Sequence, residues 1–174
     1  MTQSLVLTFI GHDRPGLVNA ISDKIAAVGG NWLESRLEHL AGQFAGIALI
    51  SVPAPRIQDL SVALRELETE GLSVTIAHGS VTEPEEGYET LTLDLLGHDR
   101  PGIVRDVTQT LTRLGVNIEE FSSFIESAPF TGEAMFRAAL RLRVPEHVAA
   151  DDVRQTLEKL ADEIMVDIKT WGEA

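Results

Sequence analysis

The chain has 174 residues, of which 44% are hydrophobic, and a formal net charge of −13 at pH 7. This length predicts one or two small domains, and the excess of acidic residues argues against direct binding to nucleic acid or to an anionic membrane surface. The absence of cysteine excludes disulfides and thiolate metal sites. Because no apolar run approaches the roughly 18 residues of a membrane span, we expect a cytoplasmic protein.

One short sequence occurs twice. Gly-His-Asp-Arg-Pro-Gly occupies residues 11–16 and again residues 97–102, an offset of 86 residues. Other residues that match at this offset include Leu5 and Leu91, Gly29 and Gly115, and Asn31 and Asn117. Because two such units account for nearly the whole chain, we predict two copies of one domain and no separate catalytic or DNA-binding domain.

Each copy is predicted to contain the same six elements, because its apolar residues alternate between the period of a strand and that of a helix. In the first copy these are a strand at residues 5–9, a helix at 17–28, strands at 31–41 and 44–53, a helix at 60–67 and a strand at 72–78. In the second copy they are a strand at residues 91–95, a helix at 103–114, strands at 117–126 and 133–144, a helix at 153–160 and a strand at 164–171.

The order βαββαβ predicts the ferredoxin-like arrangement, an α+β fold in which an antiparallel four-stranded sheet carries both helices on one face. We expect the first domain at residues 1–81, a polar linker at residues 82–87 and the second domain at residues 88–174. A linker this short predicts that the two copies pack together.

The third strand differs between the copies. In the first copy, residues 44–50 carry apolar side chains on both faces, which predicts that both faces are covered. In the second copy, apolar residues alternate with Arg137, Arg141 and Arg143, which predicts one solvated face.

The repeated hexapeptide lies between the first strand and the first helix. We place Asp13 at the helix N-cap, Pro15 in the first turn and Gly16 where the helix start approaches another backbone or a ligand. The same places in the second copy fall to Asp99, Pro101 and Gly102. The unpaired N–H groups of a helix start favour a small carboxylate. The simpler alternative is a turn that only caps the helix.

The histidines and arginines of the hexapeptide allow several interpretations. His12 and His98 lack the companions of a metal site, so we expect each to reach the neighbouring unit. Arg14 and Arg100 are predicted in the first helical turn, where a cation opposes the helix dipole. They would bind a carboxylate, pair with an acidic residue of the other unit or remain solvated.

Asn31 and Asn117 begin the second strand of each copy, and we expect each to lie beside its own loop. A carboxylate, an amide and a helix start together suit an α-amino acid, because Asp binds the ammonium group and the N–H groups bind the carboxylate. The alternative for each asparagine is turn formation.

These residues resemble a known family. Asp-Arg-Pro-Gly, an apolar helix, a glycine and then an asparagine at the start of the second strand resemble the ACT domain, a βαββαβ regulatory module that binds amino acids. The longer pattern is similar to tandem ACT proteins of the glycine cleavage system repressor type and to the ACT segment of formyltetrahydrofolate deformylase. It continues through Asn31-Trp32, Glu34-Ser35, Phe44, Gly46 and Ser51-Val52-Pro53.

The loop chemistry and the resemblance together define the candidate ligand-binding residues. These are Gly11, His12, Asp13, Arg14, Pro15, Gly16, Asn31, Gly97, His98, Asp99, Arg100, Pro101, Gly102 and Asn117. The resemblance places the polar ligand contacts on the two aspartates and the two asparagines. No catalytic motif and no metal-ligand spacing is found, so we expect no enzyme activity, no metal and no cofactor.

Three hypotheses follow. The first is a regulator that binds a small amino acid such as glycine where two ACT units meet. Its protein partner would be a transcription factor, so that it acts on DNA only indirectly. The second is a trans-acting regulatory subunit of an enzyme such as formyltetrahydrofolate deformylase or phosphoserine phosphatase. The third is an interaction module without a ligand. A homodimer is compatible with each.

Overall fold

The computed structural model describes residues 1–79, 87–160 and 165–170. The chain divides into two compact units, residues 1–83 (unit 1) and residues 84–174 (unit 2). Residues 82–86 of the predicted linker lie outside the described residues, as do Ile164 and Trp171 at the ends of the last predicted strand. No helix within the described ranges is long and apolar enough to cross a membrane.

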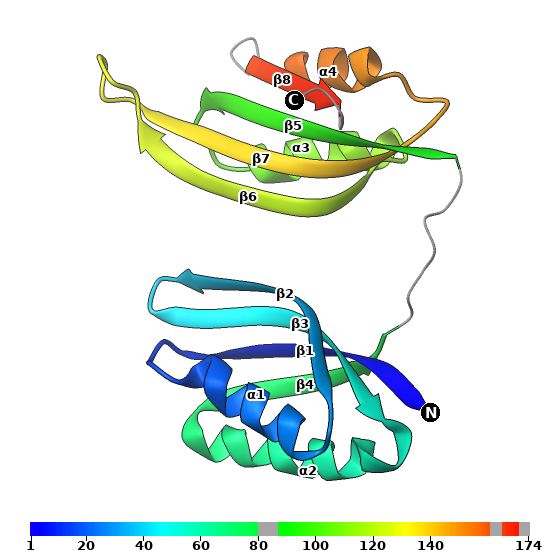
Figure 1. The fold of residues 1–174 in the computed structure, drawn as a ribbon. Helices are drawn as coiled ribbons and strands as arrows, with labels where there is room; N and C mark the ends of the chain where they lie inside the picture. Colours follow the sequence, from blue (N-terminus) through cyan, green and yellow to red (C-terminus); the bar gives the residue numbers. More distant parts are fainter. Residues whose placement is uncertain (80–86, 161–164, 171–174) are drawn as a thin grey trace. The chain divides into compact units, whose positions relative to one another are not determined.

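Unit 1 has the predicted order of elements. They are β1 (Thr2–His12), α1 (Leu17–Ala27), β2 (Asn31–Leu40), β3 (Gln43–Pro53), α2 (Ile57–Glu66) and β4 (Leu72–His78), with short 3-10 helices at Ala54–Arg56 and Leu67–Glu70. The strands form one antiparallel sheet in the order β2-β3-β1-β4. Both helices cover the same face of this sheet (Figure 1).

Unit 2 repeats the arrangement. Its elements are β5 (Tyr88–His98), α3 (Ile103–Arg113), β6 (Asn117–Ser127), β7 (Ala134–Pro145), α4 (Ala150–Glu158) and β8 (Met165–Thr170). The sheet order is β6-β7-β5-β8, again with antiparallel pairs. The predicted α+β fold with two βαββαβ units is therefore confirmed.

Each unit has its own hydrophobic core, formed where strand and helix periodicities point to the same layer. In unit 1, the alternating residues Leu5, Leu7 and Phe9 of β1 are buried. They pack with Ile21 and Ile25, which are one helical turn apart on α1. The matching strand and helix residues form the core of unit 2: Leu91, Leu93, Leu95, Val107 and Leu111.

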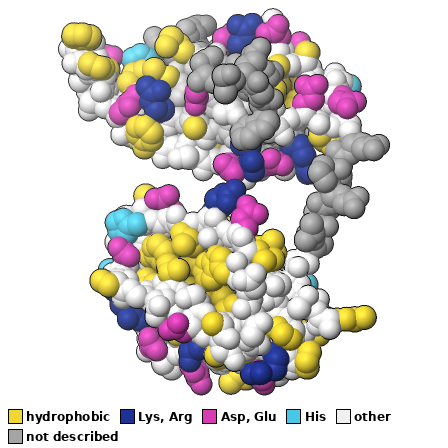
Figure 2. Space-filling view, in the orientation of Figure 1, with side chains coloured by type: hydrophobic (Ala, Val, Ile, Leu, Met, Phe, Trp, Pro, Cys, Tyr) yellow, Lys and Arg dark blue, Asp and Glu magenta, His cyan; other side chains and the backbone are white. Residues whose placement is uncertain are grey.

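The sheet of unit 1 has a second apolar face that its helices do not cover. Ala48, Ile50 and Val52 of β3 are buried in the core, whereas Ile47, on the other face, keeps 47% of its surface exposed. Hydrophobic side chains gather on this unit in the view of Figure 2. Among the described residues of unit 1 nothing covers this face of β3, so the prediction that both faces are covered depends on a second unit and stays a prediction.

The corresponding face of unit 2 is charged. Arg137 Nε lies 2.9 Å from Glu126 Oε1, and Arg141 Nη2 lies 3.0 Å from Glu120 Oε1. The Arg143 guanidinium carbon lies 5.2 Å from the centroid of the Tyr88 ring. The predicted alternation of buried apolar residues with arginines along β7 is confirmed, and ion pairs link this face to β6.

Candidate functional site

The repeated loop has the same backbone conformation in both units. The N-cap residue of α1 is Gly16, with φ 94°, and that of α3 is Gly102, with φ 87°. Neither helix has a side-chain cap hydrogen bond, so the prediction that Asp13 and Asp99 are N-caps is wrong. The left-handed glycine turns the chain into the helix three residues after each aspartate.

Two further predictions about the loop change for the same reason. Arg14 and Pro15 precede the helix, which begins at Leu17, so they do not lie in its first turn. A Cβ on Gly16 would meet nothing within 4 Å, so this glycine is required by its positive φ and not by a close approach. The close approach is at Gly11, where a Cβ would lie 2.8 Å from the carbonyl oxygen of Gly71.

The corresponding residues of unit 2 follow the same pattern. Arg100 and Pro101 precede α3, which begins at Ile103, so their predicted place in the first helical turn is also wrong. A Cβ on Gly102 would lie 3.4 Å from the Arg105 guanidinium, an ordinary contact with a flexible side chain. The positive φ of Gly102 is therefore again the reason for a glycine.

The β2–β3 hairpin holds the loop of unit 1. Its turn, Ala41–Gly42, has φ 49° and φ 80°, and positive φ at both central residues is the requirement of a type I′ turn. The Gly42 carbonyl accepts hydrogen bonds from the Asp13 backbone N–H at 3.0 Å and from Nδ1 of His12 at 2.8 Å. His12 thus contacts its own unit, and the expectation that it reaches the neighbouring unit stays a prediction.

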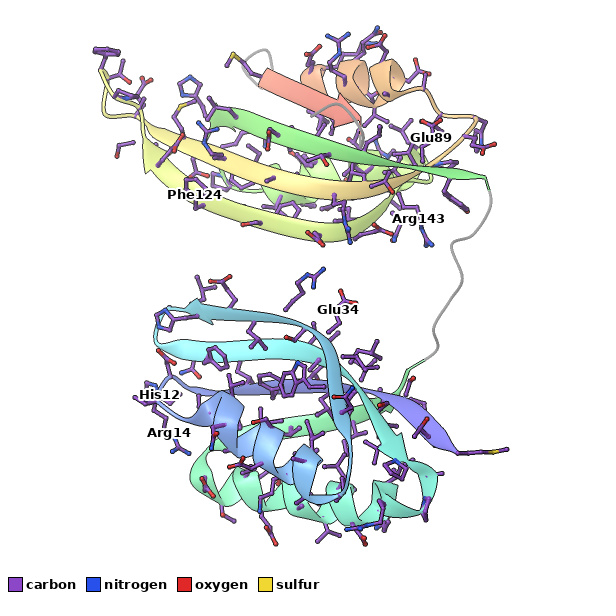
Figure 3. The ribbon with its side chains drawn as sticks, in the orientation of Figure 1. His12, Arg14, Glu34, Glu89, Phe124 and Arg143 are labelled. Atoms are coloured by element: carbon purple, nitrogen blue, oxygen red, sulfur yellow. The ribbon has the colours of Figure 1, made fainter. Side chains whose placement is uncertain are left out.

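Two side chains from distant elements complete the surroundings of this loop. Nε2 of His39, near the end of β2, lies 3.7 Å from Oδ2 of Asp13. Arg14 Nη2 donates to the Glu70 backbone carbonyl at 3.1 Å and lies 3.4 Å from its Oε2. Figure 3 shows His12 and Arg14 at the same end of unit 1. This end of the sheet therefore carries both acidic and basic groups.

A cavity of about 250 Å³ opens beside the loop of unit 1. It is lined by Asp13, Arg14, Gly16, Leu17, Val18, Asn19 and Phe44. The first N–H groups of a helix have no partner within the helix and carry partial positive charge, and α1 begins in this lining. The cavity therefore combines a carboxylate, which can bind an ammonium group, with a guanidinium and a helix start, which can bind a carboxylate group.

The loop of unit 2 has the same backbone anchor but another polar environment. The Asp99 backbone N–H donates to the Ala134 carbonyl at 2.9 Å, as Asp13 does to Gly42. Arg100 Nη1 donates to Oδ2 of Asp106 at 2.8 Å, and Arg105 Nη2 donates to Oδ1 of Asp106 at 3.2 Å. These hydrogen bonds lower the pKa of the Asp106 carboxyl, and the bond from Arg100 has the larger effect.

His98, the counterpart of His12, faces a carboxylate. Its Nδ1 lies 3.8 Å from Oε2 of Glu133, in the segment that joins β6 to β7. This segment, residues 128–133, replaces the two-residue turn of unit 1. The two hexapeptides are therefore held by hairpins of different length.

The asparagines do not lie beside their own loops. Asn31 pairs with Ser51, which pairs with Ser4 near the start of β1, whereas the loop follows His12 at the other end of that strand. Eight residues of strand separate these positions, about 26 Å at 3.3 Å per residue. Asn117 is displaced in the same way, because it pairs with Arg143 opposite Thr90. The predicted proximity is wrong within each unit.

The sequence did not predict that three further residues lie at the loops: His39, Glu70 and Asp106. Their 86-residue matches are not the same residue types: His39 matches Ile125, and Asp106 matches Ala20. A search for repeated residues therefore passes over them, and only the fold brings them to the loops. Within the described ranges, no group of three His, Cys, Asp or Glu side chains could hold a metal ion.

Comparisons with known proteins agree with the two-unit fold. ACT domain models match residues 3–76 and residues 91–164. The glycine cleavage system transcriptional repressor of Escherichia coli is 27% identical over 165 residues, covering 92% of this chain and 85% of the relative. The chain spans most of that relative's length.

Two crystal structures resemble the whole chain. An unknown protein from Galdieria sulphuraria has a TM-score of 0.86 and 28% identity, with 98% of this chain and 99% of that chain covered. A candidate glycine cleavage system transcriptional repressor has a TM-score of 0.70 and 20% identity over the same shares, which shows the fold. The chain therefore belongs to the ACT-domain family, as a regulatory protein of two tandem ACT domains related to the glycine cleavage system transcriptional repressor.

Proposed function

We propose that the protein is a non-enzymatic regulator that binds a small amino acid, such as glycine, and modulates a transcription regulator of amino-acid or one-carbon metabolism. The relationship to a transcriptional repressor at 27% identity supports the regulatory role and a cytoplasmic location. The net charge of −13 favours a protein partner over DNA, because DNA binding needs a concentrated basic face. The effect on transcription would then pass through that partner.

The observation that carries the ligand proposal is the cavity beside residues 11–16. Its volume of about 250 Å³ is below the roughly 300 Å³ at which pockets for drug-sized ligands begin, so it suits a ligand smaller than a drug, such as an amino acid. The Asp13 carboxylate would bind the ammonium group of an amino acid, and the start of α1 with Arg14 would bind its carboxylate.

An asparagine would join such a site only from a second ACT unit. Asn31 lies at the far end of its own sheet, so a site that contains both a loop and an asparagine must take them from two units. The second unit would belong to the same chain or to another copy, and the predicted meeting of ACT units at the ligand stays a prediction.

A thermal-shift screen of the full chain with the twenty amino acids tests the ligand proposal. A ligand at 100 times its Kd stabilises the folded state by about 2.7 kcal/mol, which is readily measured. We expect a shift with one or a few small amino acids, and its loss in Asp13→Ala. Asp59→Asn, an exposed carboxylate on α2 outside the cavity lining, is the matched control and should retain the shift. No shift with any amino acid would refute the proposal.

Affinity capture with and without the amino acid tests the partner. We expect a transcription regulator whose recovery changes when the amino acid is present, because coupling requires the ligand to favour one state of the complex. Recovery of a metabolic enzyme in its place, with the same ligand dependence, would transfer the regulatory role to that enzyme.

A further inference from the structure

The two loops share six residues but offer different places to an anion. Resting on the proposed function, we propose that only the loop of unit 1 takes the amino acid, because an internal carboxylate, that of Asp106, already occupies the anion position in unit 2. Of the two hexapeptide loops in one chain, one would then bind an amino acid and the other would not. The first requirement is that Asp106 lies where a ligand carboxylate would bind.

Asp106 stands in the first turn of α3, where a negative charge is stabilised by the helix dipole. It receives hydrogen bonds from Arg100 at 2.8 Å and from Arg105 at 3.2 and 3.3 Å. Only 23% of its side chain is exposed. The arginine of the second hexapeptide therefore already has a carboxylate partner, and the helix start beside it already has a negative charge.

The first turn of α1 has no acidic residue, and the residue that matches Asp106 is Ala20. The loop arginine, Arg14, instead contacts Glu70, and both side chains are about half exposed. Water screens such a pair, so it is weak and exchanges readily for another carboxylate. The helix start of unit 1 thus borders a cavity, with no carboxylate from its own first turn.

The hairpins add a second difference. His39 pairs with Phe44 in the β2–β3 ladder, and its imidazole lies 3.7 Å from Asp13. The matching residue of unit 2, Ile125, pairs with Phe136 in the β6–β7 ladder. The side chain at this position of the hairpin ladder is consequently polar in unit 1 and apolar in unit 2. A zwitterionic ligand, whose charged groups need polar partners once removed from water, fits the first environment better.

Exchanging the two first-turn residues tests the proposal. Isothermal titration of the full chain would use glycine as the first probe, and then any amino acid that shifts the melting temperature. The wild-type chain should bind one equivalent. Ala20→Asp should weaken that binding at least tenfold by supplying an internal carboxylate, whereas Ala20→Asn, equal in size and uncharged, should retain it within about threefold. Asp106→Ala should add a second equivalent.

The outcomes separate this inference from the function on which it rests. Two equivalents on the wild-type chain, equal binding by Ala20→Asp and Ala20→Asn, or one equivalent on Asp106→Ala would each overturn the inference and leave amino-acid binding intact. No heat and no thermal shift with any amino acid would overturn both. Circular dichroism verifies that each variant is folded, and Asp106→Asn replaces Asp106→Ala if the latter is not.

Discussion

The two ACT units share a backbone and a loop sequence, yet the groups around the loops differ. Gly16 and Gly102 have nearly the same φ, and Asp13 and Asp99 each donate their own backbone N–H to a carbonyl of the adjacent hairpin. The side chains that arrive from other elements are not repeated. Residues that set the backbone of a motif can therefore persist through a duplication while the chemical surroundings of the motif diverge.

The outward faces of the sheets diverge as well. Ile47 of β3 is 47% exposed on the face away from the helices, whereas Arg137 and Arg141 of β7 form ion pairs on the corresponding face of unit 2. The inward faces are both apolar because each must bury a core. Packing within a unit thus constrains one face of its sheet, and the other face is available for association. That the two copies pack together stays a prediction.

The largest expected effect tests whether the cores are equivalent. Leu7 and Leu93 occupy matching positions and are both fully buried. Replacing either by alanine should lower the free energy of unfolding of its own unit by about 2–5 kcal/mol, because a cavity replaces packed methyl groups. Urea denaturation of Leu7→Ala and Leu93→Ala measures this. A large effect in one unit alone would contradict the equivalence.

A smaller effect tests the shared loop backbone. Gly16→Ala and Gly102→Ala should each cost about 1–2 kcal/mol, because an L-residue is strained at φ 94° or 87°. Thermal denaturation provides the measurement. Ala26→Gly, at an exposed position of α1 away from the loop, is the control for an Ala–Gly difference without a positive φ and should cost about 1 kcal/mol through helix propensity alone. Loops that tolerate alanine without cost would show that the positive φ is not required.

The hairpin of unit 1 offers a stabilising substitution. Ala41 has φ 49°, the only positive φ among the non-glycine residues that the structure describes. Ala41→Asn should raise the free energy of unfolding by about 0.5–1 kcal/mol, because asparagine followed by glycine is the preferred type I′ pair. Chemical denaturation measures the gain. A loss of stability would mean that Ala41 makes contacts that outweigh its backbone strain.

The smallest effect concerns pH and is expected in unit 2 alone. Hydrogen bonds from Arg100 and Arg105 lower the pKa of Asp106 in the folded state. The carboxylate therefore contributes stability above about pH 4, its unfolded range, and this contribution is lost as the pH falls through the lower folded value. The difference in Tm between wild type and Asp106→Asn should shrink below pH 4. Ala20→Asn, at the matching position, should show no such convergence.

Much of the fold was predictable because its strands and helices depend on the spacing of apolar residues within short segments of the chain. The alternating leucines of β1 and β5 and the four-residue spacing on α1 and α3 report strands and helices without knowledge of their neighbours. The 86-residue repetition then predicts the same βαββαβ unit twice. The boundaries of the hairpin strands agree with the structure to within one or two residues.

The candidate site was less predictable because it depends on which end of the sheet each residue reaches. Helix α1, 11 residues or about 16 Å long, carries the chain back along the sheet, so Asn31 begins β2 far from its own loop. Spacing along the chain placed Asn31 next to Asp13, but the strand register separates them.

The sequence by itself determined the duplication, the ACT fold and the two buried cores, because periodicity and repetition are properties of neighbouring residues. Only the tertiary structure decided that Gly16 and Gly102 are the N-caps, that His39 approaches Asp13 and that Asp106 binds Arg100. Those contacts join a loop to a hairpin or a helix turn whose placement follows from strand register and backbone φ, which no local pattern encodes.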